Sequence, residues 1–394
     1  MNWAVAILGL AFLILIHEAG HFFAAKAVGM RPRKFYLGFP PALVKKVHGG
    51  VEYGIGTIPL GGYVKIPGMH RAAPGDLRAS LKQEQQDRLA LELDELDDAL
   101  ERGDDAAARA VLPRLQAELG DIRQVQDLEG ALAPDAYWRQ ATWRRIVAIA
   151  AGPAVNVLAA VVLFVGVYSV GVPVASRMID SVLAGHPAAV AGLQKGDTIL
   201  AVAGHPVTPA TLHTRIDATH GKPFLLTIER NDRKLTIGPL RATKGTNGYT
   251  IGVYLAAPPG PGQPLPRATV SAARFAWDLT DAQLSGIAGL AHGKGTHQVS
   301  SSVGIVNYTA QAYKTSLRDY FAFLGYISLA LALLNLLPIL PLDGGHIVMA
   351  IIERFRGRTF TQLAYLRYSA VGLSLVLIVF YLGVTNDIHN LGGG

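Results

Sequence analysis

Four long apolar stretches predict that this chain is a membrane protein. They run from about Trp3 to Ala25, from Ile146 to Val172, from Tyr320 to Leu340 and from Tyr368 to Val384. Each is long enough to cross the hydrocarbon core of a bilayer as one helix. The intervals between them are more polar and predict soluble segments inserted among the spans. The expected fold is therefore a polytopic α-helical membrane protein with four transmembrane helices.

The charges beside these stretches predict which way the chain faces. With four spans, one side of the membrane receives the basic residues that follow the first span, precede the second and lie between the third and fourth: Lys26, Arg31, Arg33, Lys34, Lys45, Lys46, Arg139, Arg144, Arg145, Arg354, Arg356, Arg358 and Arg367. Cytoplasmic segments of membrane proteins are enriched in Lys and Arg, so we expect this side to be cytoplasmic. Neither terminal tail contains Lys or Arg, and both ends are expected on the outer side.

Composition agrees with a membrane protein that carries soluble parts. Half of the 394 residues are hydrophobic and 16% are charged, below the roughly 25% of soluble domains. The net charge of +7 hides an acidic region, because residues 76–129 contain 15 acidic and 7 basic side chains. Much of the positive charge elsewhere lies beside apolar segments, which favours the lipid bilayer over nucleic acid as a partner. The absence of cysteine excludes disulfides and a thiolate metal site.

A short run after the first span has the composition of β-strands. Residues 51–55 and 63–66 are rich in apolar and aromatic side chains and predict two short strands around the Pro-Leu-Gly-Gly turn of residues 59–62. Because its neighbours are basic and its tips are apolar, we expect this hairpin to dip into the cytoplasmic face of the membrane. An ordinary surface hairpin is the alternative.

The acidic region that follows has helical periodicity. Its leucines and other apolar residues recur every three or four positions on both sides of a Gly103-Asp104-Asp105 break, which predicts an antiparallel helical hairpin within residues 76–130. Pro113 is expected to weaken or kink the second helix. This hairpin is either a solvated spacer or a docking site for a partner.

From about Pro173 to Ala257 the composition becomes that of a soluble domain. Four strands are expected at residues 198–203, 224–229, 233–237 and 249–255, with one helix near Pro209–Thr219 and a turn at Asn231-Asp232. The run from Ala188 to Leu200 resembles the A-G-L-x-x-G-D-x-I signature of bacterial PDZ domains, which bind extended peptides by strand addition. A Pro/Gly-rich linker at residues 258–266 and an amphipathic stretch at about residues 268–290, expected along the outer membrane surface, follow.

Inside the first span, the sequence His17-Glu18-Ala19-Gly20-His21 predicts a metal site. Residues four apart lie on one face of a helix, so both imidazoles can bind one ion, and zinc prefers such nitrogen ligands. Glu18 can lean over the same site and take a proton from the attacking water. Ionisable side chains are costly within a membrane helix, which argues against the alternative of histidines satisfied in a protein core. A signal peptide is disfavoured because no Lys or Arg precedes the apolar run.

Two further segments are expected to complete this site. The second span opens with small residues at 151–154, which predict close packing against the first-span helix, and Asn156 can hydrogen-bond across that interface. The third span ends in two prolines, Pro338 and Pro341, followed by Asp343. Asp343 thereby reaches the right depth to be a third, oxygen ligand, which leaves one position of a tetrahedral zinc site open.

Taken in order, these motifs resemble the site-2 protease family of intramembrane zinc metalloproteases, in the bacterial branch similar to the regulator-of-sigma-E protease. The motifs are H-E-A-G-H, G-T-I-P-L-G-G-Y-V-K, A-G-P-x-x-N, one PDZ signature and N-x-x-P-x-x-P-L-D-G-G-H. The resemblance implies Zn²⁺ bound by His17, His21 and Asp343, with Glu18 as the catalytic acid/base. The acidic helical hairpin and the single PDZ domain depart from some versions of the pattern.

The resemblance also implies the reaction and its partners. The enzyme is expected to hydrolyse a peptide bond within or near the transmembrane segment of single-span membrane proteins, in regulated intramembrane proteolysis, and both an anti-sigma factor and a remnant signal peptide are reasonable substrates. Asn335 is implied near the scissile bond, where its amide can donate to the developing oxyanion. The hairpin near Gly54–Ile66 is implied as a substrate clamp, and His346 is interpreted as a residue beside the metal ligands rather than a ligand.

Two other functions compete with a membrane protease. A zinc transporter also places histidines and acids in spans, but it needs neither Glu18 beside the ligands nor a PDZ domain. A catalytically inactive PDZ adaptor is expected to lack one of the four site residues, and all four are present.

The expected organisation places the site in a multi-pass protein of the cell membrane, with the active site toward the cytoplasmic side and the PDZ domain outside. The expected divisions are the first span with its H-E-x-x-H motif and hairpin, the cytoplasmic acidic hairpin, the second span, the PDZ domain, the linker with the amphipathic stretch, and the last two spans, at residues 1–70, 71–140, 141–172, 173–257, 258–319 and 320–394.

Overall fold

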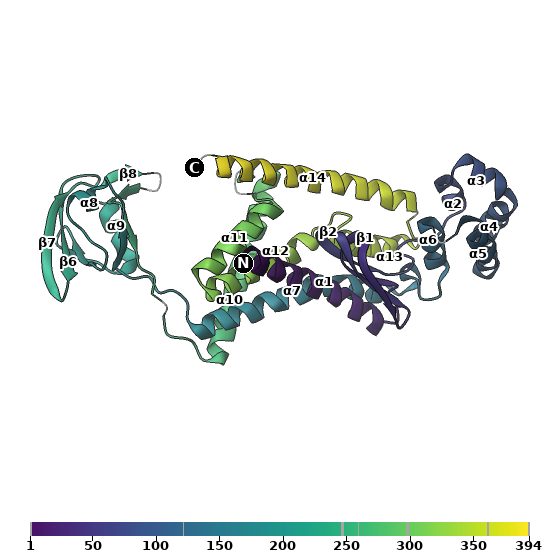
Figure 1. Ribbon diagram of the computed structural model, residues 1–394, viewed down its shortest axis with the longest axis horizontal. Helices are drawn as coiled ribbons and strands as arrows, with labels where there is room; N and C mark the ends of the chain where they lie inside the picture. The colour runs from purple at the N-terminus through teal and green to yellow at the C-terminus, as the bar shows by residue number, and fades with distance from the viewer. Residues whose placement is uncertain are drawn as a thin grey trace. The chain divides into compact units, whose positions relative to one another are not determined.

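The computed structural model forms two compact units (Figure 1). One comprises Met1–Gly166 with Thr269–Gly394, and the other comprises Val167–Ala268. The residues that the structure describes are 2–120, 122–245, 248–258, 260–296, 299–360 and 362–392.

The first unit contains the membrane helices. Within the described residues, four helices are long and apolar enough to cross a bilayer: α1 (Asn2–Ala27), α7 (Thr142–Val170), α12 (Leu317–Asn335) and the portion Gln362–Ile388 of α14 (Gln362–Gly392). The prediction of four membrane-spanning helices is confirmed in number and place. The third span ends at Asn335 rather than near Leu340, because proline lacks an amide donor and disfavours helix in the residue before it.

Helices α1 and α7 pack closely through small residues. A Cβ atom placed on Gly20 of α1 would lie 2.6 Å from the carbonyl oxygen of Ala151, and one placed on Gly152 of α7 would lie 2.2 Å from the His21 ring. The expected close approach is therefore present. The expected hydrogen bond of Asn156 to the first-span helix is not seen in the described residues; instead the Ser328 hydroxyl of α12 donates to the Asn156 main-chain carbonyl at 2.8 Å. The buried Asn156 amide has no hydrogen-bond partner among the described residues.

Strands β1 (Lys34–His48) and β2 (Val51–Lys65) form an antiparallel hairpin around Gly49 and Gly50. Both strands bend, and the register places residues 34–37 opposite residues 52–55 and also opposite residues 62–65. The sequence-based pairing was therefore wrong: the two expected strands do not pair with each other around Pro-Leu-Gly-Gly but flank the first part of β1. The central segment was missed because β1 contains two adjacent prolines, which are unfavourable inside a strand.

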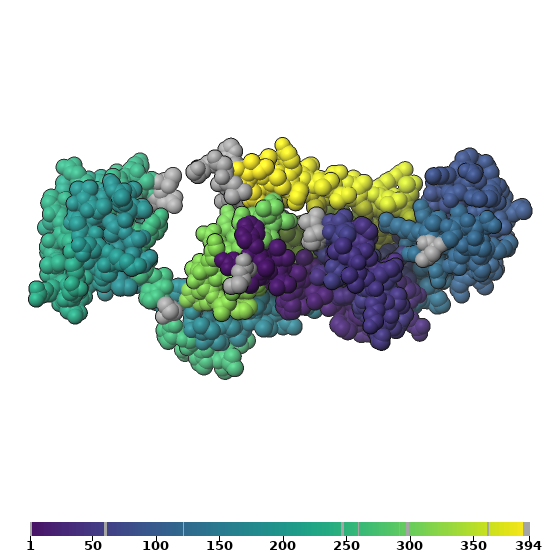
Figure 2. Space-filling model, in the orientation of Figure 1, coloured from purple at the N-terminus to yellow at the C-terminus, as the bar shows by residue number. Residues whose placement is uncertain are grey.

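The hairpin exposes a row of large apolar side chains: Phe39, Leu43, Val44, Val47, Ile55 and Ile58. Figure 2 shows the hairpin segment uncovered on the face in view. At its base the hairpin is fixed to the following helical region, because Lys65 pairs with Asp127 at 2.9 Å and Arg33 pairs with Asp135 at 3.2 Å.

The acidic region folds into a small helical bundle. Its elements are α2 (Asp76–Ser80), α3 (Gln83–Arg88), α4 (Ala90–Arg102), α5 (Asp105–Leu119), α6 (Arg123–Leu132) and the 3-10 turn η1 (Tyr137–Arg139). The expected pair of helices corresponds to α4 and α5, which pack together around buried leucines. Asp104 caps α5 by accepting from the amides of Ala106 and Ala107 at 3.1 and 3.0 Å. Pro113 lies inside α5 without ending it.

The second unit is a small α/β domain that follows the expected elements closely. It contains β3 (Ile179–Val182), α8 (Pro187–Val190), β4 (Thr198–Val202), β5 (His205–Pro206), α9 (Pro209–Asp217), β6 (Phe224–Arg230), β7 (Arg233–Leu240), β8 (Thr243–Gly245), β9 (Gly248–Thr250) and β10 (Val253–Leu255). Four of the strands form a sheet in the order β5-β4-β6-β7. Asn231 and Asp232 make the expected turn with φ of 50° and 59°, the conformation of a type I′ hairpin.

The A-G-L-x-x-G-D run of this domain has a structural reason. Gly192 and Gly196 have positive φ, which a side chain would strain. The Asp197 side chain is 1% exposed, accepts from the Gln194 amide at 2.8 Å and pairs with the Arg230 guanidinium at 2.7 Å. The residues of this signature thus hold the start of β4 in place through the buried Asp197 side chain.

Three further helices complete the first unit: α10 (Leu265–Ala291), α11 (Ser302–Thr315) and α13 (Asp343–Arg356). The amphipathic stretch lies within α10, whereas no helix was predicted at the position of α11, inside the expected division 258–319. Ser301 caps α11 by accepting from the Val303 amide at 3.2 Å. Asp387 of α14 accepts from the Ser301 amide at 2.7 Å, so tertiary contacts also fix the start of α11.

Candidate active site

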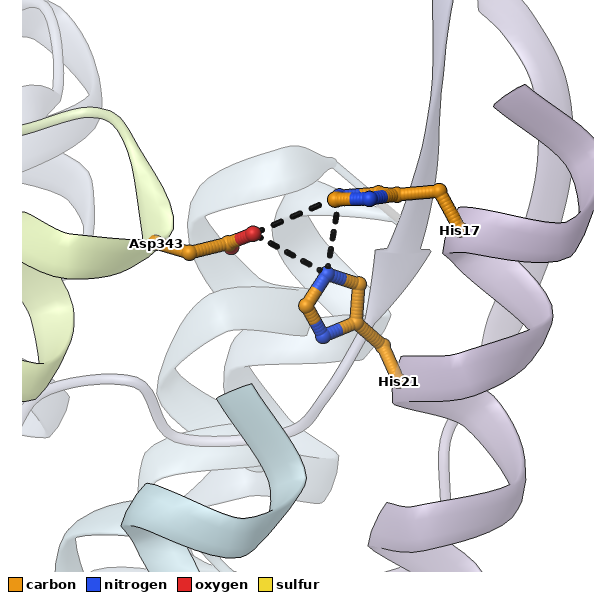
Figure 3. Close-up of side chains that lie close together, drawn as sticks. All are labelled: His17, His21 and Asp343. Atoms are coloured by element: carbon orange, nitrogen blue, oxygen red, sulfur yellow. Dashed lines mark hydrogen bonds and ion pairs between the residues drawn. The ribbon is translucent and has the colours of Figure 1, made fainter. Parts of the chain in front are cut away.

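Two histidines and one aspartate converge between α1 and α13 (Figure 3). His17 and His21 point from successive turns of α1, and their Nε2 atoms are 3.2 Å apart. Asp343 points toward them from the first residue of α13, and its Oδ2 atom lies 3.3 Å from each of the two nitrogens. The two histidines are 6% and 7% exposed. The three residues singled out as metal ligands are thus brought together from opposite ends of the chain.

The Gly344-Gly345 pair allows Asp343 to reach this position. A Cβ atom on Gly344 would lie 2.2 Å from the Leu336 carbonyl oxygen, and one on Gly345 would lie 2.4 Å from the Leu340 amide nitrogen. Only glycine permits the chain after α12 to fold so tightly against the start of α13. The P-L-D-G-G sequence therefore turns the chain and presents the carboxylate to α1.

Helix α7 fixes the orientation of His21. The Nδ1 atom of His21 lies 3.0 Å from the carbonyl oxygen of Ala148. A carbonyl can only accept, so Nδ1 carries the proton, and Nε2 is the ring atom left to bind a metal when the ring is neutral. This arrangement is the usual support of a metal-binding histidine. Gly152, one turn further along α7, leaves room for the ring.

The three side chains fit a zinc ion by type and by spacing. In a tetrahedral site with bonds of 2.0–2.2 Å, neighbouring ligand atoms are about 3.4 Å apart, close to the observed separations of 3.2 and 3.3 Å. Asp343 Oδ2 is buried and has no hydrogen-bond partner among the described residues, although both imidazoles face it. An oxygen in that situation is suited to bind a cation shared with the two nitrogens.

Glu18 lies beside these three residues and against the hairpin. It follows His17 directly, and a Cβ atom on Gly62 of β2 would lie 2.7 Å from Glu18 Cγ. Where the bent strand β2 comes closest to Glu18, it therefore has a glycine, whose missing side chain leaves room for the glutamate. Sequence analysis marked the Gly61-Gly62 pair as a turn; its packing against Glu18 is visible only in the fold.

Asn335 and His346 lie on either side of the loop that leads to Asp343. Asn335 is the last residue of α12, and its side-chain amide donates to the Leu331 carbonyl of the same helix at 2.9 Å. His346 lies one turn into α13 and stacks on Tyr365, with ring centroids 6.1 Å apart. Burial lowers the pKa of His346 to about 4, so its ring is neutral at physiological pH. It is outside the cluster of three converging ligand atoms.

Comparison with known proteins gives one family and several full-length relatives. The model of Peptidase family M50 matches residues 5–379 of the chain. The chain is 28% identical to the regulator of sigma-W protease RasP of Bacillus subtilis (strain 168), over 96% of this chain and 96% of that protein. It is 27% identical to the zinc metalloprotease RasP of Bacillus licheniformis, over 99% of this chain and 100% of that protein. These matches include the membrane helices, both soluble insertions and the converging residues.

Proposed function

The chain belongs to peptidase family M50 and is an intramembrane zinc metalloprotease, and on this basis we propose the catalytic and metal-binding roles of its residues. His17, His21 and Asp343 hold the zinc ion, and Glu18 is the acid/base. The single observation that carries this assignment is the convergence of the three ligand atoms at 3.2–3.3 Å, with Glu18 next to His17 in the chain. A zinc transporter would have no use for that glutamate.

When bound, zinc supplies a Lewis acid that lowers the pKa of water toward about 7 and polarises a peptide carbonyl. The chain supplies the proton transfers. A carboxylate oxygen of Glu18 takes the proton from the water that attacks the carbonyl carbon and passes it to the amide nitrogen as the peptide bond breaks. The Asn335 amide, released from its bond to Leu331, donates to the carbonyl oxygen as negative charge develops on it.

The hairpin is proposed to hold the substrate in an extended form. A peptide bond within a helix is shielded, so the substrate span must unwind, and its freed amides need partners at membrane depth. Among the residues that the structure describes, residues 62–65 pair with β1 alone, along one edge, and Gly62 lies against Glu18. Strand addition along this edge would bring an extended peptide beside Glu18 while satisfying its backbone. The exposed apolar row of the hairpin agrees with its insertion into the cytoplasmic face of the membrane.

The second unit is proposed to be a PDZ domain on the outer side that selects substrates by size. The A-G-L-x-x-G-D-x-I signature and the sequence order of strands and helix support this identity, and the domain is expected to bind peptide segments. The distribution of basic residues supports a cytoplasmic active site with both termini outside. Helix α10 exposes Trp277 and other large apolar side chains, which supports its place along the outer membrane surface.

The substrates are proposed to be single-span membrane proteins that control transcription. The relative in Bacillus subtilis is named for regulation of sigma-W, and on that likeness we propose an anti-sigma factor as a physiological substrate in regulated intramembrane proteolysis. Remnant signal peptides remain a second candidate, because they are also short apolar helices.

The assignment is tested by separating zinc binding from proteolysis. The Glu18→Gln variant should keep about one zinc per chain and lose cleavage of a model transmembrane substrate by about 100- to 10,000-fold, because only the proton acceptor is removed. Asp343→Ala should lose both zinc and cleavage. Glu101→Gln, on the exposed end of α4, serves as the control and should behave as wild type. Substantial cleavage by Glu18→Gln would mean that another group is the base.

A further inference from the structure

A buried ion pair lies behind the candidate metal site and is not part of it. Arg145 of α7 donates to Glu353 of α13, and the two side chains are 5% and 4% exposed. In the sequence, Arg145 is one of the basic residues that predict the orientation of the chain, and no local pattern predicts a role for Glu353. The cost of removing two charges from water can exceed the free energy gained from their attraction, so stability alone is a weak reason for such a pair.

The pair joins the two helices that position the metal ligands. Arg145 lies one turn before Ala148, whose carbonyl fixes the His21 ring at 3.0 Å. Glu353 belongs to α13, the helix that begins with Asp343. A rotation or slide of α13 relative to α7 would therefore move Asp343 away from His21, and the Arg145–Glu353 bond opposes that motion.

Arg145 and Glu353 each also contact a further segment of the protein. The Arg145 guanidinium carbon lies 4.6 Å from the centre of the Tyr137 ring, and the Tyr137 amide donates to the Pro67 carbonyl at 2.9 Å, just after β2. The second oxygen of Glu353 accepts from the Phe360 amide at 2.7 Å, in the segment that leads into α14. The pair thus connects α7, α13, the base of the hairpin and the start of the fourth span.

We propose that Arg145 and Glu353 are positioning residues of the metalloprotease, whose ion pair sets the distance between Asp343 and His21. This inference rests on the proposed zinc ligands. It predicts that the pair controls zinc affinity and the alignment of the reacting groups rather than global stability or substrate affinity. Buried ion pairs that specify geometry can be replaced by apolar residues of similar volume without loss of stability, which separates the two roles.

The test compares full-length proteins in detergent. In the double variant Arg145→Met with Glu353→Met, the thermal unfolding midpoint should stay close to that of wild type. Its zinc Kd, measured by competition with a chelator, should rise about tenfold or more, as expected when the support of metal ligands is removed. With zinc in excess, kcat should fall while KM for a model transmembrane substrate changes less than about twofold.

A matched control uses another ion pair of the same unit. Arg139 pairs with Asp105, and its guanidinium also lies over an aromatic ring, that of Trp138, at 4.3 Å. Replacing this pair by Met and Leu should leave the zinc Kd unchanged. A folded Arg145→Met, Glu353→Met protein with wild-type zinc affinity and kcat would overturn the inference. If wild type itself bound no zinc, the proposed ligand set would fail instead.

A second variant covers the case in which the double variant does not fold. Glu353→Gln keeps the size of the side chain and its acceptor for the Phe360 amide, but it removes the charge that pairs with Arg145. Its zinc Kd should rise by a smaller factor than in the double variant, again with kcat more affected than KM. A wild-type zinc Kd and kcat in this variant would likewise overturn the positioning role.

Discussion

Gly62 of the hairpin lies directly against Glu18 of the first membrane helix, so that a Cβ atom on the glycine would come within 2.7 Å of Glu18 Cγ. It would also lie 2.8 Å from the Tyr36 carbonyl oxygen. A residue with a side chain cannot occupy this position unless the strand or the glutamate moves. The contact connects the proposed substrate strand with the proposed acid/base.

Gly62→Ala should therefore impair catalysis without removing zinc. Displacing Glu18 by about 1 Å is expected to lower kcat/KM by about 10- to 100-fold, whereas His17, His21 and Asp343 are untouched and elemental analysis should give the wild-type zinc content. Gly286→Ala is the control, because a Cβ atom there meets nothing within 4 Å. Wild-type activity in Gly62→Ala would show that the hairpin does not constrain Glu18.

Gly152→Ala, unlike Gly62→Ala, should weaken zinc binding. The added methyl group would lie 2.2 Å from His21 Nε2, the proposed ligand atom, so the ring must leave its place between α7 and Asp343. We expect the zinc Kd to rise about tenfold or more. Gly166→Ala on the same helix is matched in chemistry and meets nothing within 4 Å. Equal zinc affinity in the two variants would argue that His21 does not bind zinc through Nε2.

Removal of the proposed PDZ domain should leave a working protease. The two chain segments that lead into and out of the second unit are joined by backbone bonds, from Gly260 to Val172 at 2.9 Å and from Val174 to Pro258 at 2.9 Å. A short Gly/Ser linker in place of residues 175–257 should therefore preserve the rest of the chain. We expect pre-trimmed substrates to be cleaved at the wild-type rate and some untrimmed ones to become substrates. Loss of all cleavage in a folded protein would favour a direct activating role.

The stability of the second unit should depend on pH through Asp197. Burial of the carboxyl acts to raise its pKa, but hydrogen bonds from Arg230 and the Gln194 amide outweigh burial and hold the pKa below its usual value. A carboxyl with a lower pKa in the folded state contributes stability that is fully present above its unfolded pKa of about 3.9 and is lost as the pH falls through the folded pKa.

Hydrogen exchange of residues 179–255 in the full-length protein measures this effect. Protection, corrected for intrinsic exchange rates, should fall as the pH is lowered below about 4. In Asp197→Asn, protection should be lower at neutral pH and should change less with pH. Asp180→Asn is the control, because Asp180 is 53% exposed in its pair with Lys195. The same pH dependence in wild type and Asp197→Asn would exclude Asp197 as its source.

The sequence by itself determined the features that depend on local pattern. A run of about 20 apolar residues is long enough to cross a bilayer as one helix, and the four such runs are helices in the described part of the structure. The strands and helix of residues 198–255 follow from alternation and turn residues, including Asn231 and Asp232. His17 and His21 share a helix face because they are four residues apart, so two of the three candidate metal ligands are a consequence of helical geometry alone.

The tertiary structure decided how distant segments meet, including Asp343 and the two histidines, whose meeting the sequence indicated only through membrane depth and family resemblance. Asp343 reaches His17 and His21 because the glycines at 344 and 345 let the start of α13 pack directly against the backbone that follows α12. Residues 34–37 pair with both parts of β2 because both strands bend. The alternation of apolar and polar residues along a strand does not predict such a bend. Arg145 and Glu353 are 208 residues apart in the chain, and nothing in either local sequence specifies the other. Pairings of this kind depend on packing and desolvation, which exist only once the helices have come together.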